Sequence, residues 1–333
     1  MIKMNNKKIE LNNSTYLIAE AGINHNGDIK IAKKMIESAA ASGADGIKFQ
    51  TIFPDELFSK NINSKLYELS KDWILTKKDH LELQKHSKKN KIDFFSTPFG
   101  LKSAKLLQQI KVPFIKIASG EITNHDLITY LSKMKIPMLV STGMTTISEI
   151  AEVVEIIKQH NCPFTLLHCV SSYPTLVKDA NLSTIQYLKN TFNVPVGFSD
   201  HTTGVEVSLA AVALGASVIE KHFTLDKNMP GPDQKLSLDP SEFLELSKKT
   251  KLIEKAMGTP RSTIIKSEIN FRDNMRKSLG AKSDIMPGTI VKRSMISLFR
   301  PGIGIPPNMI NNIIGRTIKK PVVGGTLLKW DDF

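Results

Sequence analysis

Residues 46–51 read GIKFQT, and residues 114–119 read FIKIAS. Each stretch has the length and the apolar content of a buried strand, with one lysine at its centre. An ammonium group in such surroundings is costly to desolvate unless an anion lies beside it. Lys48 and Lys116 therefore predict buried strands whose lysines face an anionic partner.

From Tyr16 onward, eight strand-like runs alternate with amphipathic helical segments, in which apolar residues recur at spacings of three and four, as at Ile31, Met35 and Ile36. Eight consecutive βα units predict an α/β fold, a closed (β/α)8 TIM barrel. An open doubly wound dinucleotide fold would have GxGxxG after its first strand, where this chain has EAGINHNG. The expected strands span residues 16–21, 46–51, 93–98, 114–119, 137–142, 164–169, 194–200 and 218–223.

A domain boundary is expected near residue 258. The last barrel helix should span residues 240–257, because Gly258-Thr259-Pro260 stops a helix. This assigns residues 1–258 to the barrel and the polar residues 259–276 to a linker or bridging helix. In residues 277–333, short β-like pieces alternate with Pro and Gly turns, which predicts a small C-terminal β-rich domain.

The composition excludes several classes of protein. The net charge of +13 comes mainly from lysines on helical faces, without the aromatic or motif signatures of nucleic-acid binders, so no nucleic-acid partner is expected. The apolar runs are too short to span a bilayer and the N-terminus lacks a secretory signal, which favours a cytoplasmic protein without a membrane partner. Both cysteines, Cys162 and Cys169, are expected to be reduced.

The predicted strands end on polar side chains, at the position where (β/α)8 barrels carry their active sites. One ionisable residue in an apolar strand is often only structural, but here nearly every strand has one. Two lysines among several hydroxyl groups suit a phosphate and a carboxylate, which predicts a small, doubly anionic, phosphorylated substrate. The polar end residues are Glu20, Lys48, Gln50, Thr97, Lys116, Ser119, Glu121, Ser141, His168, Ser199, His201, Glu220 and His222.

His201 and His222 end the last two predicted strands, which are neighbours in a closed barrel. Two imidazoles with Glu20 nearby are typical of a catalytic divalent-metal site, although one histidine could instead be a hydrogen-bonded core residue. The ligand types suit Mn, Mg, Fe or Zn. Glu121 follows the fourth strand, where a catalytic proton donor or acceptor would lie, whereas Glu220 is expected to be a structural partner of a lysine.

Ten motifs occur in order along nearly the whole chain. They are AEAGINHNG (19–27), IKFQT (47–51), STPF (96–99), KIASGEITN (116–124), STGM (141–144), LLHC followed by SYP (166–174), GFSDHT (197–202), EKHFTLD (220–226), GPDQKLSL (231–238) and RPGIGI (300–305). In these motifs the chain resembles the sialic acid synthases, which make N-acetylneuraminate, legionaminate or pseudaminate from phosphoenolpyruvate and a six-carbon N-acyl amino sugar. The resemblance implies that residues 277–333 form an antifreeze-like (SAF) domain.

The resemblance also implies a role for each matching residue. His201 and His222 would hold manganese or magnesium. The SAF domain would be exchanged across a homodimer, so that Arg300 reaches the partner's sugar, although a surface arginine beside a Pro-Gly turn is the simpler alternative. The phosphoenolpyruvate-binding residues would be Lys48, Thr97, Lys116, Ser119, Ser141 and Ser199. The sugar-binding residues would be Gln50, Tyr173, Asp233 and Arg300, and the catalytic residues Glu20, Glu121, Lys48 and Lys116.

The implied reaction condenses phosphoenolpyruvate with an N-acyl mannosamine-type sugar to give a nonulosonic acid and phosphate, with N-acetylneuraminate as the first expectation. The alternative is a legionaminate or other 5,7-diamino nonulosonate synthase that uses a 2,4-diacetamido-2,4,6-trideoxy hexose, because Ser171, Ser172 and Gln234 stand at sugar-facing places where the chain departs from some relatives. A 3-deoxy-octulosonate-8-phosphate-type synthase would lack the RPGIGI domain. A noncatalytic carbohydrate or ice binder would not need both lysines and both histidines.

Overall fold

The computed structural model describes residues 2–4, 7–9 and 14–333. The chain forms two compact units, Met1–Gly258 and Thr259–Phe333. No helix among the described residues is long and apolar enough to cross a membrane. An antiparallel pair, β1 (Ile2–Met4) and β2 (Lys7–Ile9), precedes the barrel. Strands of three residues are too short to show a periodic pattern, and the sequence did not predict this pair.

Eight parallel strands of the first unit close into a barrel, in the order β10-β3-β4-β5-β6-β7-β8-β9. His222 of β10 lies opposite Glu20 of β3, so the last barrel strand pairs with the first. The predicted (β/α)8 fold is therefore confirmed. The strands are β3 (Tyr16–Gly22), β4 (Gly46–Thr51), β5 (Asp93–Pro98), β6 (Ile115–Ile117), β7 (Met138–Ser141), β8 (Phe164–Cys169), β9 (Val196–Asp200) and β10 (Val218–His222).

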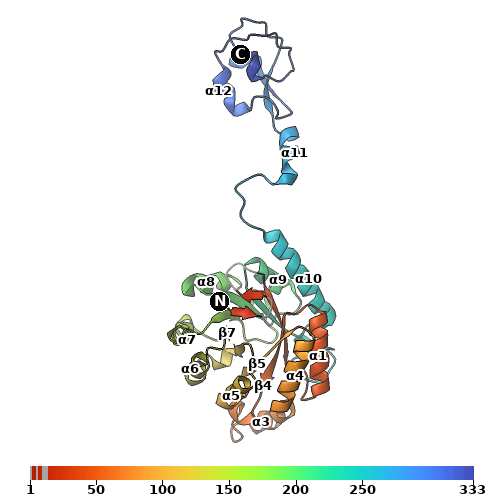
Figure 1. The fold of residues 1–333 in the computed structure, drawn as a ribbon, viewed down its shortest axis with the longest axis vertical. Coiled ribbons are helices and arrows are strands. Elements are labelled where there is room, and N and C mark those ends of the chain that lie inside the picture. Colours follow the sequence, from red (N-terminus) through yellow and green to blue (C-terminus); the bar gives the residue numbers. More distant parts are fainter. Residues whose placement is uncertain (1, 5–6, 10–13) are drawn as a thin grey trace. The chain divides into compact units, whose positions relative to one another are not determined.

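Helices follow each strand and surround the barrel (Figure 1). They bury the apolar faces that their sequences predict; in the first helix Met35, Ile36 and Ala39 are fully buried. Thr146 and Glu149 form a reciprocal capping box at the start of α7. The barrel helices are α1 (Ile29–Ala41), α4 (Lys77–Lys89), α5 (Leu101–Gln109), α6 (His125–Lys133), α7 (Ile147–Gln159), α8 (Ser183–Phe192), α9 (Glu206–Ala213) and α10 (Pro240–Met257).

Two connections differ from a simple βα unit. Between β4 and α4 the chain forms α2 (Pro54–Leu57), α3 (Ser64–Ser70) and a 3-10 turn, Lys71–Trp73. After β6 a second 3-10 turn, Ser119–Glu121, begins at the last residue of the predicted strand, and β6 is correspondingly shorter than expected. Both connections lie at the C-terminal ends of the strands, so they shape the mouth of the barrel.

The barrel interior has an apolar floor. Tyr16, at the start of β3, donates a hydrogen bond from its hydroxyl to Asp93 Oδ2 (2.7 Å). Side chains of a strand alternate between its two faces, so the residues two positions after Ile18 and Phe114 also point inward, and these are Glu20 and Lys116. The polar residues therefore lie one layer above the floor. The floor consists of Tyr16, Ile18, Phe95, Phe114, Leu139, Leu167 and Val218.

The second unit has its own small core. It begins with α11 (Lys266–Met275), within the stretch predicted as a linker or bridging helix, and β11 (Ser278–Ala281) pairs antiparallel with β12 (Ile296–Phe299). A short helix, α12 (Ile310–Ile313), follows. The core residues include Leu279, Ile285, Val291, Ile305, Ile313, Ile318, Val322 and Leu328.

A buried ion pair outside the barrel interior joins β9, β10 and α9. Lys221 lies between the inward residues 220 and 222, and its Nζ contacts Asp200 Oδ2 at 2.8 Å and Thr202 O at 2.5 Å. Ser208 of α9 donates to the same Asp200 oxygen (2.5 Å). Both charged side chains are at most 1% exposed. The network therefore holds together the strand ends that carry the two predicted metal ligands.

Lys221→Met should lower the free energy of unfolding by about 3–5 kcal/mol, because it leaves the Asp200 carboxylate buried without its cation. Urea denaturation followed by circular dichroism measures the change. Lys249→Met is the control, since Lys249 pairs with Glu245 on the exposed surface of α10 and its loss should leave the midpoint unchanged. An unchanged midpoint for Lys221→Met would contradict the stabilising role of the pair.

His25, in the loop between β3 and α1, is buried in a neutral form. Its Nδ1 accepts a hydrogen bond from Gly27 N (2.9 Å), and its Nε2 has no hydrogen-bond partner among the described residues. Burial, together with nearby His80, lowers the pKa of His25 to about 4. Between that pH and the usual histidine pKa of about 6.5 the unfolded chain binds more protons, so stability falls as the pH drops through this range.

His25→Asn should make the protein less sensitive to acid. The Asn amide oxygen can accept the Gly27 hydrogen bond but does not titrate, so the variant should lose less stability between pH 6.5 and pH 4, by up to about 3 kcal/mol. Urea titrations of both proteins at the two pH values give the difference. Equal losses of stability would show that His25 takes up no extra proton on unfolding.

Candidate active site

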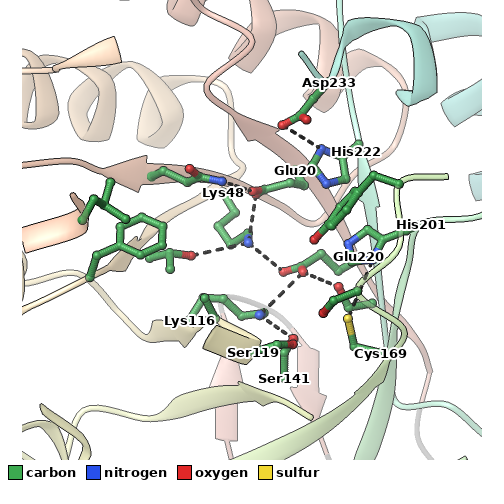
Figure 2. Close-up of a pocket in the computed structure, with 18 of the residues that line it drawn as sticks. Glu20, Lys48, Lys116, Ser119, Ser141, Cys169, His201, Glu220, His222 and Asp233 are labelled. Carbon is green, nitrogen blue, oxygen red and sulfur yellow. Dashed lines mark hydrogen bonds and ion pairs between the residues drawn. The ribbon is translucent and has the colours of Figure 1, made fainter. Parts of the chain in front are cut away.

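A cavity of about 410 Å³ opens at the C-terminal ends of the barrel strands. Figure 2 shows lysines, carboxylates and histidines that converge on it from different strands. Among the described residues of the first unit that were assigned a catalytic role or a role in binding metal, phosphoenolpyruvate or sugar, Glu121 does not line it. Those that do are Glu20, Lys48, Gln50, Thr97, Lys116, Ser119, Ser141, Tyr173, Ser199, His201, His222 and Asp233.

Lys48 lies between two carboxylates. Its Nζ is 3.1 Å from Glu20 Oε2 and 3.2 Å from Glu220 Oε2, and it donates to Thr97 Oγ1 at 3.4 Å. Burial alone would lower the pKa of Lys48, but the two carboxylates outweigh burial and raise it. The anionic partner that the sequence demanded for Lys48 is therefore present within the protein itself.

Lys116 has weaker anionic support. Its Nζ donates to Ser141 Oγ (2.5 Å) and Ile117 O (3.0 Å) and lies 3.8 Å from Glu220 Oε1. Burial lowers the pKa of Lys116, and one carboxylate at this distance does not offset the effect. An anionic ligand beside Lys116 would supply the close partner that Lys48 already has.

The two carboxylates of this cluster differ in protonation. Burial would raise the pKa of Glu220, but Lys116 and Lys48 outweigh it and lower the pKa to about 2. Ser199 also donates to Glu220 (2.7 Å). Burial, and the charge of Glu220, raise the pKa of Glu20 to about 7 against the influence of Lys48. Glu220 is therefore a permanent counter-ion, whereas Glu20 can exchange a proton near neutral pH.

His201 and His222 lie beside each other, with ring centroids 5.4 Å apart (Figure 2). His201 Nδ1 is 2.8 Å from Val170 O, and a donated hydrogen bond there leaves its Nε2 lone pair free. His222 Nδ1 is buried without a hydrogen bond to any described residue, 3.8 Å from Asp233 Oδ2. The Tyr173 ring lies 4.2 Å from the His201 ring and 5.9 Å from the His222 ring.

The two histidines fit a divalent metal ion. Burial, and then His201 and Lys48, lower the pKa of His222 well below its usual value, so its imidazole is neutral as a ligand must be. Across the described ranges, no three His, Cys, Asp or Glu side chains are grouped as metal ligands. Two protein ligands would leave several coordination positions open, which suits a catalytic rather than a structural ion.

The remaining predicted sugar-facing residues divide into two groups. Gln50 donates to Glu20 Oε1 (3.4 Å), and Ser171 also lines the cavity. Gln234 does not face the cavity, contrary to expectation. Its side chain is fully buried and its amide donates to Asn24 O (3.0 Å). Gln234 therefore stabilises the loop between β3 and α1 instead of contacting the cavity.

Two predicted site residues lie elsewhere. Glu121 is half-buried, and its carboxylate accepts a hydrogen bond from Asn124 Nδ2 (2.8 Å) at the start of α6. Arg300 is exposed in the second unit, next to β12. Their catalytic and sugar-binding roles stay predictions.

The sequence analysis missed the apolar side of the cavity. Ile52, Leu57, Phe58 and Trp73 come from the connection between β4 and α4, and Phe99 follows β5. Apolar residues in irregular segments have no periodicity that shows where they point, and no chemistry that marks them as site residues. Only Ile52 and Phe99, which directly follow β4 and β5, had a position in the sequence that could have suggested them.

His201→Ala and His222→Ala should each abolish Mn²⁺ binding measured by calorimetry, because each removes one of two imidazole ligands. The far-ultraviolet circular dichroism should stay that of the wild type. His125→Ala, at a partly exposed position on α6, is the control and should bind the ion normally. Wild-type affinity in either cavity variant would remove that histidine from the metal site.

Comparison with known proteins identifies the family. The NeuB family matches residues 35–262, and the SAF domain matches residues 276–333. The N,N'-diacetyllegionaminic acid synthase of Campylobacter jejuni is 42% identical over 92% of this chain and 96% of its own. Human N-acetylneuraminate-9-phosphate synthase is 34% identical over 91% and 88%. The crystal structure of N-acetylneuraminic acid synthetase from Leptospira borgpetersenii, in complex with citrate, is 41% identical, with a TM-score of 0.78 over 81% of this chain and 95% of that one.

These matches extend over both units and confirm the resemblance seen in the sequence. The NeuB match covers most of the barrel, including the strands that carry the two lysines and the two histidines. Enzymes of this family are generally metal-dependent, in keeping with the paired imidazoles. The chain therefore belongs to the NeuB family, as a phosphoenolpyruvate-condensing nonulosonic acid synthase with a C-terminal SAF domain.

Proposed function

We propose that the enzyme condenses phosphoenolpyruvate with a 2,4-diacetamido-2,4,6-trideoxy hexose to give N,N'-diacetyllegionaminic acid and phosphate. This proposal takes the alternative before the first expectation, N-acetylneuraminate. The legionaminic acid synthase of Campylobacter jejuni is 42% identical, slightly above the 41% of the Leptospira N-acetylneuraminic acid synthetase and above the 34% of the human N-acetylneuraminate-9-phosphate synthase. The observation that carries the condensation itself is the buried cluster of Lys48, Lys116, Glu20 and Glu220 beside His201 and His222.

Phosphoenolpyruvate would bind at the lysines. Its phosphate and carboxylate need cations and hydroxyl donors, and Lys116 has the ammonium group with the weaker anionic support. Glu220 keeps both lysines in place before the substrate arrives. The hydroxyl groups that complete this proposed subsite are those of Thr97, Ser119, Ser141 and Ser199.

Carbon–carbon bond formation joins C3 of phosphoenolpyruvate to the aldehyde carbon of the open-chain sugar, and water then adds at C2 before phosphate leaves. His201 and His222 would hold manganese or magnesium, which supplies Lewis-acid polarisation of the aldehyde oxygen. Glu20, with a pKa of about 7, would transfer protons to the new hydroxyl group or from the attacking water. Lys48 and Lys116 would stabilise the charge on the departing phosphate.

Two further parts of the proposal come from the family resemblance. The enzyme would act in the cytoplasm as a homodimer that exchanges SAF domains, with Arg300 directed at the partner's sugar. Glu121 would support proton transfer only if the 3-10 turn that carries it moves toward the substrate, because it lies outside the cavity lining. The complete cluster of cavity residues argues against a noncatalytic carbohydrate binder.

Phosphate release should require phosphoenolpyruvate, Mn²⁺ and the acceptor sugar together. With the diacetamido trideoxy hexose, kcat/KM should exceed that with N-acetylmannosamine by about tenfold or more. Malachite-green detection of phosphate and mass spectrometry of the product measure both. A preference for N-acetylmannosamine would restore N-acetylneuraminate as the product, and no turnover with either sugar would contradict the proposal.

A further inference from the structure

The cavity lining includes four apolar side chains from two neighbouring connections, Leu57, Phe58, Trp73 and Phe99, which are called the apolar wall below. Each of these side chains is partly exposed, and the cavity is the open space beside them. Partly exposed aromatic and aliphatic groups in a pocket favour a ligand that places apolar atoms against them. Polar groups of a sugar would lose hydrogen bonds to water there without replacement.

Phe99 of the wall lies across the barrel from His201, and the rest of the wall comes from the neighbouring connection after β4. In the closed order of strands, β9 is separated from β5 by four positions in either direction, and β10 is separated from β4 by β3 alone on one side. Phe99 follows β5 and therefore stands opposite His201, which follows β9. If the aldehyde end of an open-chain hexose lies at the histidines, its other end extends toward the β4–β5 side of the cavity.

The wall is held in place by contacts that need no ligand. Glu56, next to Leu57 in α2, accepts a hydrogen bond from Ser103 N (3.0 Å) at the start of α5. A Cβ atom on Gly100 would lie 2.4 Å from the Glu56 carboxylate, so glycine leaves the space for this contact. Tyr67 donates to Asp55 Oδ1 (2.7 Å) and ties α3 to α2. These contacts fix α2, which carries Leu57, before a ligand binds.

None of the described residues that line the cavity places a free cation at the wall. Within the described part of the cavity lining, the lysines are Lys48 and Lys116, which are at most 5% exposed and are engaged with Glu20 and Glu220. A phosphate at the far end of the sugar would therefore have no buried counter-ion in the described lining and could draw only on exposed lysines outside it, such as Lys71 and Lys102. A hydroxyl group there would face aromatic and aliphatic carbon.

We infer that Leu57, Phe58 and Trp73 receive the C6 methyl group of the acceptor and so select a 6-deoxy sugar over its 6-hydroxy and 6-phospho counterparts. The inference rests on the proposed function for the identity of the reaction but concerns a separate part of the pocket. If the wall selects the sugar, enzymes with this fold can keep the same reacting groups at the lysines and histidines and still accept different sugars.

The test compares two sugars that differ only at C6, N-acetylmannosamine and 2-acetamido-2,6-dideoxymannose. The wild type should prefer the 6-deoxy sugar by about 10- to 100-fold in kcat/KM, the range in which an apolar pocket rejects an added hydroxyl. Phe58→Gln and Leu57→Gln should each reduce that ratio at least fivefold while the KM for phosphoenolpyruvate stays unchanged. Ile62→Gln, an 89% exposed position in the same connection, is the matched control.

Calorimetric binding of both sugars to the enzyme loaded with Mn²⁺ but without phosphoenolpyruvate gives the preference between them without turnover. A failure of the proposed function, with no phosphate released, therefore leaves the inference testable. A wild-type ratio near one, or a ratio that both wall variants leave unchanged, would overturn the inference even if the condensation is observed. Tighter binding of N-acetylmannosamine 6-phosphate than of either sugar would also overturn it.

Discussion

The structure depends on the neutralisation of four ionisable groups inside the barrel. Lys48 and Lys116 are buried and could not stay charged alone, and Glu220 contacts both of them. Glu20 adds a second carboxylate to Lys48 but keeps a pKa of about 7. The resulting cluster is balanced in charge yet has one lysine with weak anionic support and one carboxylate that can exchange a proton. These are the properties that binding and turnover of a phosphorylated anion require.

Side chains alternate between the two faces of a strand, and this alternation places the charged groups of β10 on opposite sides of the sheet. In β10 residues 220 and 222 face the cavity, whereas Lys221 faces outward and pairs with Asp200. The outward ion pair fixes the ends of β9 and β10, so the backbone positions of Glu220 and His222 are fixed as well. The same three-residue stretch thus supplies a counter-ion, a structural cation and a metal ligand candidate. A shift of one residue in the register of β10 would turn Glu220 and His222 outward and Lys221 inward. The correct register is therefore needed for the chemistry of the site.

Chemistry and selectivity come from different parts of the barrel. The condensation groups lie on the barrel strands or directly after them, where the sheet fixes their positions. Most of the apolar wall lies in the connection between β4 and α4, and Phe99 follows β5. Connections can vary in sequence without disturbing the core. This division is consistent with a family whose members, by their names, make different nonulosonic acids. The wall would then be the part of the enzyme that varies with the sugar.

The sequence by itself determined the barrel, the polar strand ends and the family, because strand alternation and ordered motifs are local patterns that a chain carries in one dimension. It also placed Lys48, Lys116, His201 and His222 correctly at the cavity. Only the tertiary structure decided that Glu220 joins both lysines, that Glu121 lies outside the cavity lining and Gln234 supports a loop, and that Leu57 and Phe58 form a wall. Those outcomes depend on distances between segments far apart in the chain and on side-chain directions in irregular connections, and neither has a periodic signature.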